Sequence, residues 1–291
     1  LLAYALAVGT VGAMVLRRAA WTSQAPRLAV AAWHVLSLSV LGAIALAGLL
    51  MLNPGPHTEM GSLSWSTHML VAGNFSQVAP TLWCVLFVAF AVVTLLRTSL
   101  WLARSLLGSR RERAAHLQQL SFLGSHDPTR DALVVDNPLA VAYCLPGPRP
   151  AVVLTTGALS ALDGDELEAV LEHERAHLRG RHDLILATSR GLERAWRHVP
   201  VFRWAHQEQK RLLEMVADDA AARHGTRRTV ATAMVRMAES GVPAAALGAG
   251  GSHVVARVDR MLQPRRPIGR LATVAVVSAL ALVAVLPVLV A

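Results

Sequence analysis

The sequence has 291 residues, of which 54% are hydrophobic and only 16% are charged. An ordinary soluble domain has about a quarter of its residues charged, so this composition argues against a soluble protein. The formal net charge is +9, but no recognition motif and no interleaving of aromatic and basic residues accompanies it, so direct nucleic-acid binding is not expected. Two cysteines, Cys84 and Cys144, provide neither a disulfide framework nor a Cys-rich metal site.

Four stretches contain no Asp, Glu, Lys or Arg, and they cover residues 1–16, 28–52, 79–96 and 271–291. A membrane-spanning helix needs about 20 apolar residues, so the sequence predicts four transmembrane helices. We place the first three at about 1–16, 28–52 and 79–103, which gives a three-helix segment over 1–103, and the fourth at 267–291. A signal peptide is the alternative for the first stretch, although its basic pair, Arg17 and Arg18, follows the apolar run.

The basic residues indicate the orientation in the membrane. Three arginines lie between the first two runs, the others lie between the third and fourth runs, and the 53–78 loop has no Lys or Arg. The positive-inside rule then places the first and third connections in the cytoplasm and both termini outside a cell (inner or plasma) membrane. The net positive charge of the segment after residue 104 suits a domain that lies on an anionic lipid bilayer.

Residues 104–266, between the third and fourth runs, are long enough for one globular domain. The pattern predicts a helical extension over 97–120, then a small sheet, and then helices, which together make a mixed α+β domain in a mainly α-helical membrane protein. The expected strands cover 132–135, 141–145 and 151–155. The expected helices cover 163–179, 182–196, 202–224, 227–239 and 254–262, with a capping box at Asp163 and Glu166, a helix end at Gly180, and a flexible loop over 241–253.

The stretch "VLEHERAHLRGRHD" contains the spacing H-E-x-x-H at His173, Glu174 and His177. Residues four apart share one face of a helix, so the two imidazoles can bind one Zn²⁺ ion while Glu174 lies beside a bound water. A third ligand is needed, and the best acidic candidate is Glu214 in "KRLLEMVADD". Asp218, one turn later, could accept the second N–H of a ligand histidine. The alternative is that these are charged helices in solvent.

These motifs carry a resemblance to a known family. "DELEAVLEHERAHLRGRHD" followed by "RLLEMVAD", with "NPLAVAYCLPG" before them, resembles the membrane gluzincins, both the BlaR/MecR-like antirepressor peptidases and the HtpX/CAAX-protease kind. The resemblance implies a zincin-like fold and a zinc endopeptidase. It also implies that His173, His177 and Glu214 are metal ligands, that Glu174 is the general base, and that Asp218 supports a ligand.

The resemblance also implies a protein or peptide substrate, by analogy a winged-helix transcriptional repressor and also the chain itself. The sequence ends after the fourth run without a penicillin-binding sensor domain, so direct β-lactam sensing is not expected and a separate sensor partner would carry the signal. Two alternatives remain open, namely a quality-control protease for membrane proteins and a non-enzymatic scaffold with structural zinc.

The sequence leaves three further questions open: the donor to the oxyanion, the role of His34, and the role of the 141–145 strand. The donor to a developing oxyanion is not fixed by the pattern, and the candidates are His253, Arg211, His182 and His224. His253 would reach back from a loop, whereas Arg211 could instead be a structural ion-pair partner. His34, in the second apolar run, is expected to be a helix-to-helix hydrogen-bond partner. The 141–145 strand could accept an extended substrate at its edge, or it could be ordinary core.

Overall fold

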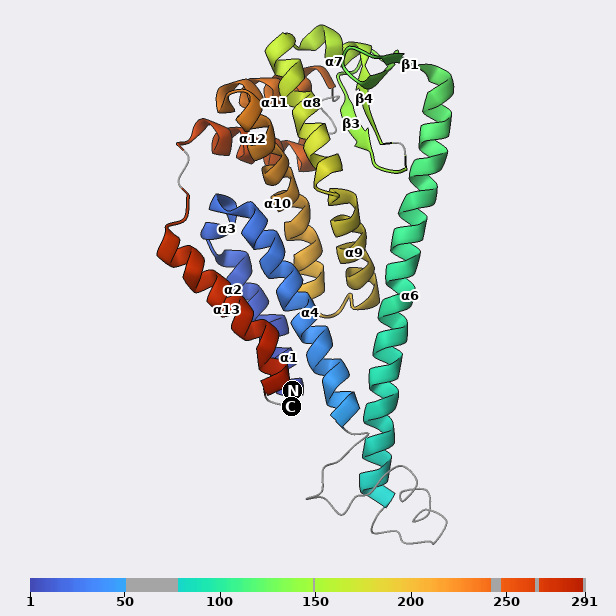
Figure 1. Ribbon diagram of the computed structural model, residues 1–291, viewed down its shortest axis with the longest axis vertical. Coiled ribbons are helices and arrows are strands. Elements are labelled where there is room, and N and C mark those ends of the chain that lie inside the picture. The colour runs from blue at the N-terminus through green and yellow to red at the C-terminus, as the bar shows by residue number, and fades with distance from the viewer. Residues whose placement is uncertain (51–77, 149, 242–246, 265–266, 290–291) are drawn as a thin grey trace.

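The computed structural model describes residues 1–50, 78–148, 150–241, 247–264 and 267–289. The chain is mainly helical, and its long helices run beside one another below a small sheet and a group of shorter helices (Figure 1). The mainly α-helical character and the small sheet that the sequence predicts are therefore confirmed. The expected fourfold span and the 104–266 domain boundaries stay predictions.

Three of the described helices are long and apolar enough to cross a membrane, which indicates a membrane protein. These helices are α4 (Pro26–Leu50), a stretch of α6 (Val78–Leu123) and α13 (Arg270–Leu289). Helix α6 has 46 residues and continues through the predicted basic extension without a break. Where α4 and α6 cross, a Cβ on Gly48 would lie 2.1 Å from the Cβ of Ala91, so this contact requires a glycine.

The first apolar run is helical but irregular. It consists of α1 (Leu2–Ala7), a π-helical stretch (Val8–Gly12) and α2 (Ala13–Arg18), followed by the short α3 (Trp21–Gln24). Each of these helical segments is shorter than a membrane span, so the predicted first transmembrane helix, at residues 1–16, is not confirmed. The run nevertheless packs against α4, and Ala13 is fully buried in the shared core.

A proline determines how three of these helices are joined. A helical carbonyl normally accepts a hydrogen bond from the N–H four residues later, but for Val283 that residue is Pro287, which has no N–H. The Tyr4 hydroxyl donates to the Val283 carbonyl at 2.6 Å, and the Ser39 hydroxyl donates to it at 2.7 Å. Hydroxyls from α1 and α4 therefore satisfy a carbonyl of α13 in an apolar environment, where an unpaired one is costly.

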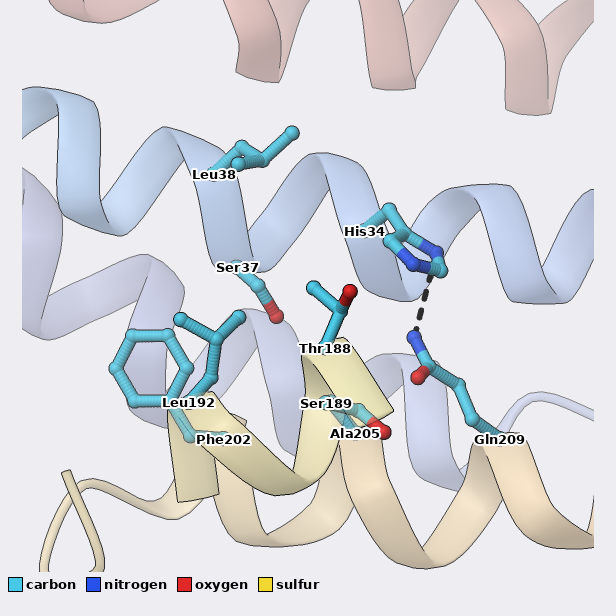
Figure 2. Close-up of a pocket in the computed structure, with 9 residues that line it drawn as sticks. All are labelled: His34, Ser37, Leu38, Thr188, Ser189, Leu192, Phe202, Ala205 and Gln209. Atoms are coloured by element: carbon cyan, nitrogen blue, oxygen red, sulfur yellow. Dashed lines mark hydrogen bonds between the residues drawn. The ribbon is translucent and has the colours of Figure 1, made fainter. Parts of the chain in front are cut away.

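Helices α9 (His182–Ala195) and α10 (Pro200–His224) form a hairpin that packs against α4 and α6. Its contact with α6 is close, because a Cβ on Gly191 would lie 3.1 Å from the Cα of Leu102. Figure 2 shows polar side chains where α4, α9 and α10 meet, around a cavity of about 30 Å³ that has room for about one water molecule. There the Gln209 Nε2 atom lies 3.3 Å from His34 Nδ1, so the predicted helix-to-helix hydrogen bond of His34 is confirmed.

The four strands form one sheet in the order β1-β2-β4-β3. They are β1 (Gly124–Asp127), β2 (Ala132–Val135), β3 (Ala142–Leu145) and β4 (Ala151–Thr155). The β2–β4 pair is parallel, and the β1–β2 and β3–β4 pairs are antiparallel. The three expected strands are confirmed, and β3 begins one residue later than predicted. Strand β1 was not predicted, because "GSHD" has none of the residues that favour strands.

The sheet is buried on both faces by helices of the same domain. Along β4, Val152 and Leu154 face the core of α8 (Gly164–Arg179), whereas Val153 faces Leu120 of α6. Helices α7 (Thr156–Ala161), α11 (Arg227–Gly241) and α12 (Leu247–Leu262) complete this part. The predicted 241–253 loop needs correction, because the chain is helical from Leu247; its 242–246 part lies outside the described residues.

Removing both donors to the Val283 carbonyl, with Tyr4→Phe and Ser39→Ala, is expected to lower the free energy of unfolding by about 1–3 kcal/mol. With Pro287→Ala added, the backbone N–H of residue 287 supplies the missing donor, so the loss should shrink. Unfolding in detergent micelles measures both effects, and Ser109→Ala, which removes a hydroxyl bonded within α6, is the control. An equal loss with and without Pro287→Ala would contradict this account.

Candidate metal centre

Helix α8 presents the H-E-x-x-H residues and has a well-defined start. The Asp163 side chain accepts from the Glu166 backbone N–H at 3.0 Å, and the Glu166 side chain accepts from the Asp163 backbone N–H at 3.1 Å. This is the predicted capping box, and it is confirmed. Glu166 also forms a 2.6 Å ion pair with Arg236 of α11. The cap therefore fixes both the first turn of α8 and its contact with a neighbouring helix.

Two turns further along α8, His173 and His177 meet Glu214 of α10. The two Nε2 atoms lie 3.2 Å apart, and each lies 3.5 Å from one oxygen of the Glu214 carboxylate. One ligand atom from each of the three residues lies within 4.8 Å of the others. Two imidazoles and one carboxylate in this arrangement can hold one metal ion and leave a position open for water or substrate. The structure thus brings the three sequence-predicted ligands together.

Asp218 and Arg257 contact the residues of this cluster. The Asp218 carboxylate is completely buried, and its Oδ1 atom lies 3.1 Å from His173 Nδ1, as the spacing of Glu214 and Asp218 predicts. Arg257 of α12 donates to both Asp218 oxygens, at 2.6 and 2.9 Å, and its Nη1 atom lies 2.9 Å from Glu214. A carboxylate that holds the second nitrogen of a ligand histidine fixes both its tautomer and the orientation of its ring.

The Asp218 and Glu214 carboxylates strongly favour positive charge at the centre of the site. Burial alone would lower the pKa of His173, but hydrogen bonds with Asp218 and Glu214 outweigh it and raise this pKa to about 9. Burial alone would raise the pKa of Glu214, but His173 and Arg257 lower it to about 2. Without a metal, His173 is therefore protonated at neutral pH. A bound metal cation would replace that proton as the positive charge beside the carboxylates. This donor set fits a divalent ion.

His177 is held differently from His173. Its Nδ1 atom lies 2.8 Å from Nδ1 of His182, the first residue of α9. Burial and the charge of His173 lower the pKa of His177 to about 4, so its imidazole is neutral and has a free lone pair at neutral pH. The turn before His182 makes this contact possible, because Arg181 has a left-handed backbone (φ 48°) and a Cβ on Gly180 would lie 2.5 Å from the His182 ring.

Glu174 lies beside the cluster without belonging to it. Burial raises the pKa of its carboxyl, and the opposing charge of His173 offsets this only in part. Its neighbour is Cys144 of β3; burial of the thiol, together with the negative charge of Glu174, raises the pKa of Cys144 to about 12. The thiol is therefore neutral, and Glu174 has a higher proton affinity than an exposed carboxylate.

The other predicted residues lie elsewhere or are not described. Arg211 pairs with Glu208 one turn before it on α10, at 2.9 Å. His224 contacts Glu172 at 3.3 Å, at the end of α10. The side chain of His253 lies outside the described residues, so its predicted role stays a prediction. Sequence reasoning missed Arg257, and it did not predict the contact of Cys144 with Glu174.

The arrangement combines a buried cluster of two histidines and one glutamate with a carboxylate of raised pKa next to it, and such a site defines a metallopeptidase. Residues 108–261, more than half of the chain, match peptidase family M48, whose members are metal-dependent. The chain therefore belongs to peptidase family M48. Comparison with curated proteins and with solved structures found no match.

Metal affinity is expected to rise about tenfold per pH unit between pH 6.5 and 9 and then to level off. The reason is that His173, with its pKa of about 9, must lose a proton before it can bind the ion, whereas His177, with its pKa of about 4, is already neutral. Competition with a chromophoric chelator for Zn²⁺ measures this dependence.

A second test is the variant Asp218→Asn, which removes the main cause of the raised pKa of His173. It should move the plateau to lower pH and weaken binding about 10–100-fold. Asp165→Asn, in the first turn of α8, should leave the curve unchanged. A metal affinity that is independent of pH over this range would contradict the release of a proton from His173 on metal binding.

Proposed function

We propose that the protein is a zinc-dependent endopeptidase that hydrolyses peptide bonds beside a membrane. The observation that carries the proposal is the position of Glu174, a buried carboxylate next to the His173, His177 and Glu214 cluster. When bound, Zn²⁺ would supply a Lewis acid that polarises the scissile carbonyl and acidifies water. A purely structural zinc site does not need a buried carboxylate beside an open coordination position. The presence of Glu174 therefore favours an enzyme over a non-enzymatic scaffold.

Glu174 is the residue we assign to proton transfer. Its carboxylate takes the proton of the attacking water and passes it to the leaving nitrogen, as a general base and then a general acid. The raised pKa of Glu174 supports this assignment, because burial makes its carboxylate a better proton acceptor than an exposed one. Cys144 lies beside the Glu174 carboxylate as a neutral thiol, so it adds no second negative charge there.

An extended peptide is the substrate shape we infer. Among the strands that the structure describes, β3 is at an edge of the sheet and pairs with β4 on one side, so its outer backbone groups can bond to an added strand. Cys144 lies on β3 and contacts Glu174, so a peptide along this edge passes the proposed base. Main-chain hydrogen bonds would hold such a substrate with little dependence on its side chains.

We propose four membrane-spanning helices, with α1 to α2 as the fourth, both termini outside and the peptidase domain in the cytoplasm. The hydrogen bonds from Tyr4 and Ser39 to Val283 support the fourth span, because they place α1 beside two candidate spans. The basic residues near the ends of α2, α4 and α13 support the orientation.

The substrate is proposed from the resemblance to the antirepressor peptidases. Regulatory cleavage of a winged-helix repressor, and of the chain itself, is the first candidate, with a separate sensor partner that supplies the signal. Cleavage of misfolded membrane proteins is the alternative. Both candidates use the same site, so only the identity of the substrate separates them.

Glu174→Gln is expected to keep the metal and lose hydrolysis by at least about 100-fold, since the base is gone while the ligands remain. Glu214→Ala is expected to lose both, because one of three ligands is missing. Metal content by mass spectrometry and cleavage of casein in detergent measure the two effects. Glu168→Gln, at an exposed position on the same helix, should change neither. Full activity in Glu174→Gln would refute the mechanism.

A comparison of new protein N-termini in cells that carry the wild type or Glu174→Gln is expected to show cuts in a soluble DNA-binding repressor with the wild type only. Cuts confined to membrane proteins would instead support quality control. Identical profiles in the two strains, with and without a cell-wall antibiotic as trigger, would contradict both substrates.

A further inference from the structure

A cavity of about 420 Å³ lies close to the metal centre on the membrane side of the domain. It is formed by the first turns of α4, the turn between α8 and α9, and the middle of α10. Its polar lining includes Arg27, Arg179, Arg223 and His182, and its apolar lining includes Val30 and Leu213. The function proposed above gives this cavity no role.

The cavity is a place of uncompensated positive charge. No Asp or Glu lines it. Arg179 pairs with Glu172 at 2.8 Å, but neither Arg27 nor Arg223 pairs with a carboxylate within the part of the chain that the structure describes. The guanidinium groups of Arg27 and Arg223 therefore leave positive charge at the cavity that an anion can neutralise. Guanidinium groups match the oxygens of a phosphate particularly well.

The position of Arg27 places the cavity at the level of the lipid headgroups. Arg27 is the second residue of α4, which is a candidate span over Pro26–Leu50. A residue at the end of a span lies where the hydrocarbon ends and the polar part of the bilayer begins. Helix α13 starts at Arg270 at the same end as α4, and helices α11 and α12 lie beyond both starts (Figure 1).

The remainder of the lining is apolar and continues toward the hydrocarbon. Val30 lies three residues after Arg27 on α4 and lines the cavity together with Ile185 of α9 and Val216 of α10. The cavity therefore presents charged side chains to a headgroup and apolar side chains to the first part of an acyl chain.

We propose that this cavity binds the phosphate headgroup of an anionic phospholipid, with Arg27 and Arg223 as its main partners and Val30 and Ile185 against the first part of an acyl chain. Basic pockets between spanning helices at the membrane surface are suited to such headgroups. The bound lipid would lie against His182, whose Nδ1 atom is 2.8 Å from His177. The proposal concerns binding and does not depend on the peptidase activity.

The test uses the full chain in detergent and measures retained lipid by native mass spectrometry, a readout that needs no proteolysis. Phosphatidylglycerol and phosphatidylcholine with the same acyl chains are compared first. The wild type is expected to retain phosphatidylglycerol at least about tenfold better. Equal retention of the two lipids overturns the proposal without any variant.

The double variant Arg27→Gln/Arg223→Gln is then expected to lose this preference about tenfold. The matched control is Arg110→Gln/Arg228→Gln, which removes the same charge from exposed positions outside the cavity. An equal loss in the control means that the preference comes from overall charge, and it overturns the site.

Two competitors separate the possible sources of the anion. Inorganic phosphate at millimolar concentration should leave phosphatidylglycerol bound, and its displacement would mean that the cavity takes free phosphate. An acidic peptide should also fail to displace the lipid, and displacement by it would assign the cavity to a polypeptide. Either displacement overturns the proposal for a lipid, while peptidase activity can be present or absent in every case.

Discussion

The buried carboxylate of Asp218 is the constraint that organises the catalytic half of the molecule. A fully buried charge is tolerated only when it is paired, and Asp218 is paired by Arg257 from α12 and by His173 from α8. These contacts join three helices at one point. Arg257 also pairs with Glu214, so a single guanidinium contacts both Glu214 of the candidate metal cluster and the carboxylate that contacts His173. Loss of this pairing would leave several carboxylates facing one another.

The same principle of satisfying polar groups explains the apolar half. There the unpaired group is the Val283 carbonyl, which Pro287 leaves without a donor, and hydroxyls from two other helices bond to it. His34 and Gln209 form a similar contact between α4 and α10. In both halves a few polar contacts determine which helices are neighbours. Apolar burial supplies most of the stabilisation in the half that contains the sheet, whereas close van der Waals packing supplies it between the candidate spans.

The metal cluster could be predicted because its signal is local. His173 and His177 share one helix face, and the acid at Glu214 lies on a second predictable helix. Arg257 could not be predicted, because "VVARVDRML" also contains Arg260, which pairs with Asp219 in a parallel contact of the same two helices. Spacing alone does not show which arginine faces the centre. Strand β1 could not be predicted either, since it forms through pairing with β2 and not through its own residues.

Helix α6 connects a candidate membrane span directly to the sheet. It is continuous over 46 residues, about 70 Å at 1.5 Å per residue, and passes directly into β1. Near its end His116 lies 2.9 Å from the Tyr143 hydroxyl on β3, and the next residue, Cys144, contacts Glu174. A tilt of this rigid rod, imposed at its far end, would therefore shift the edge strand and the proposed base together, without any loop to absorb the motion.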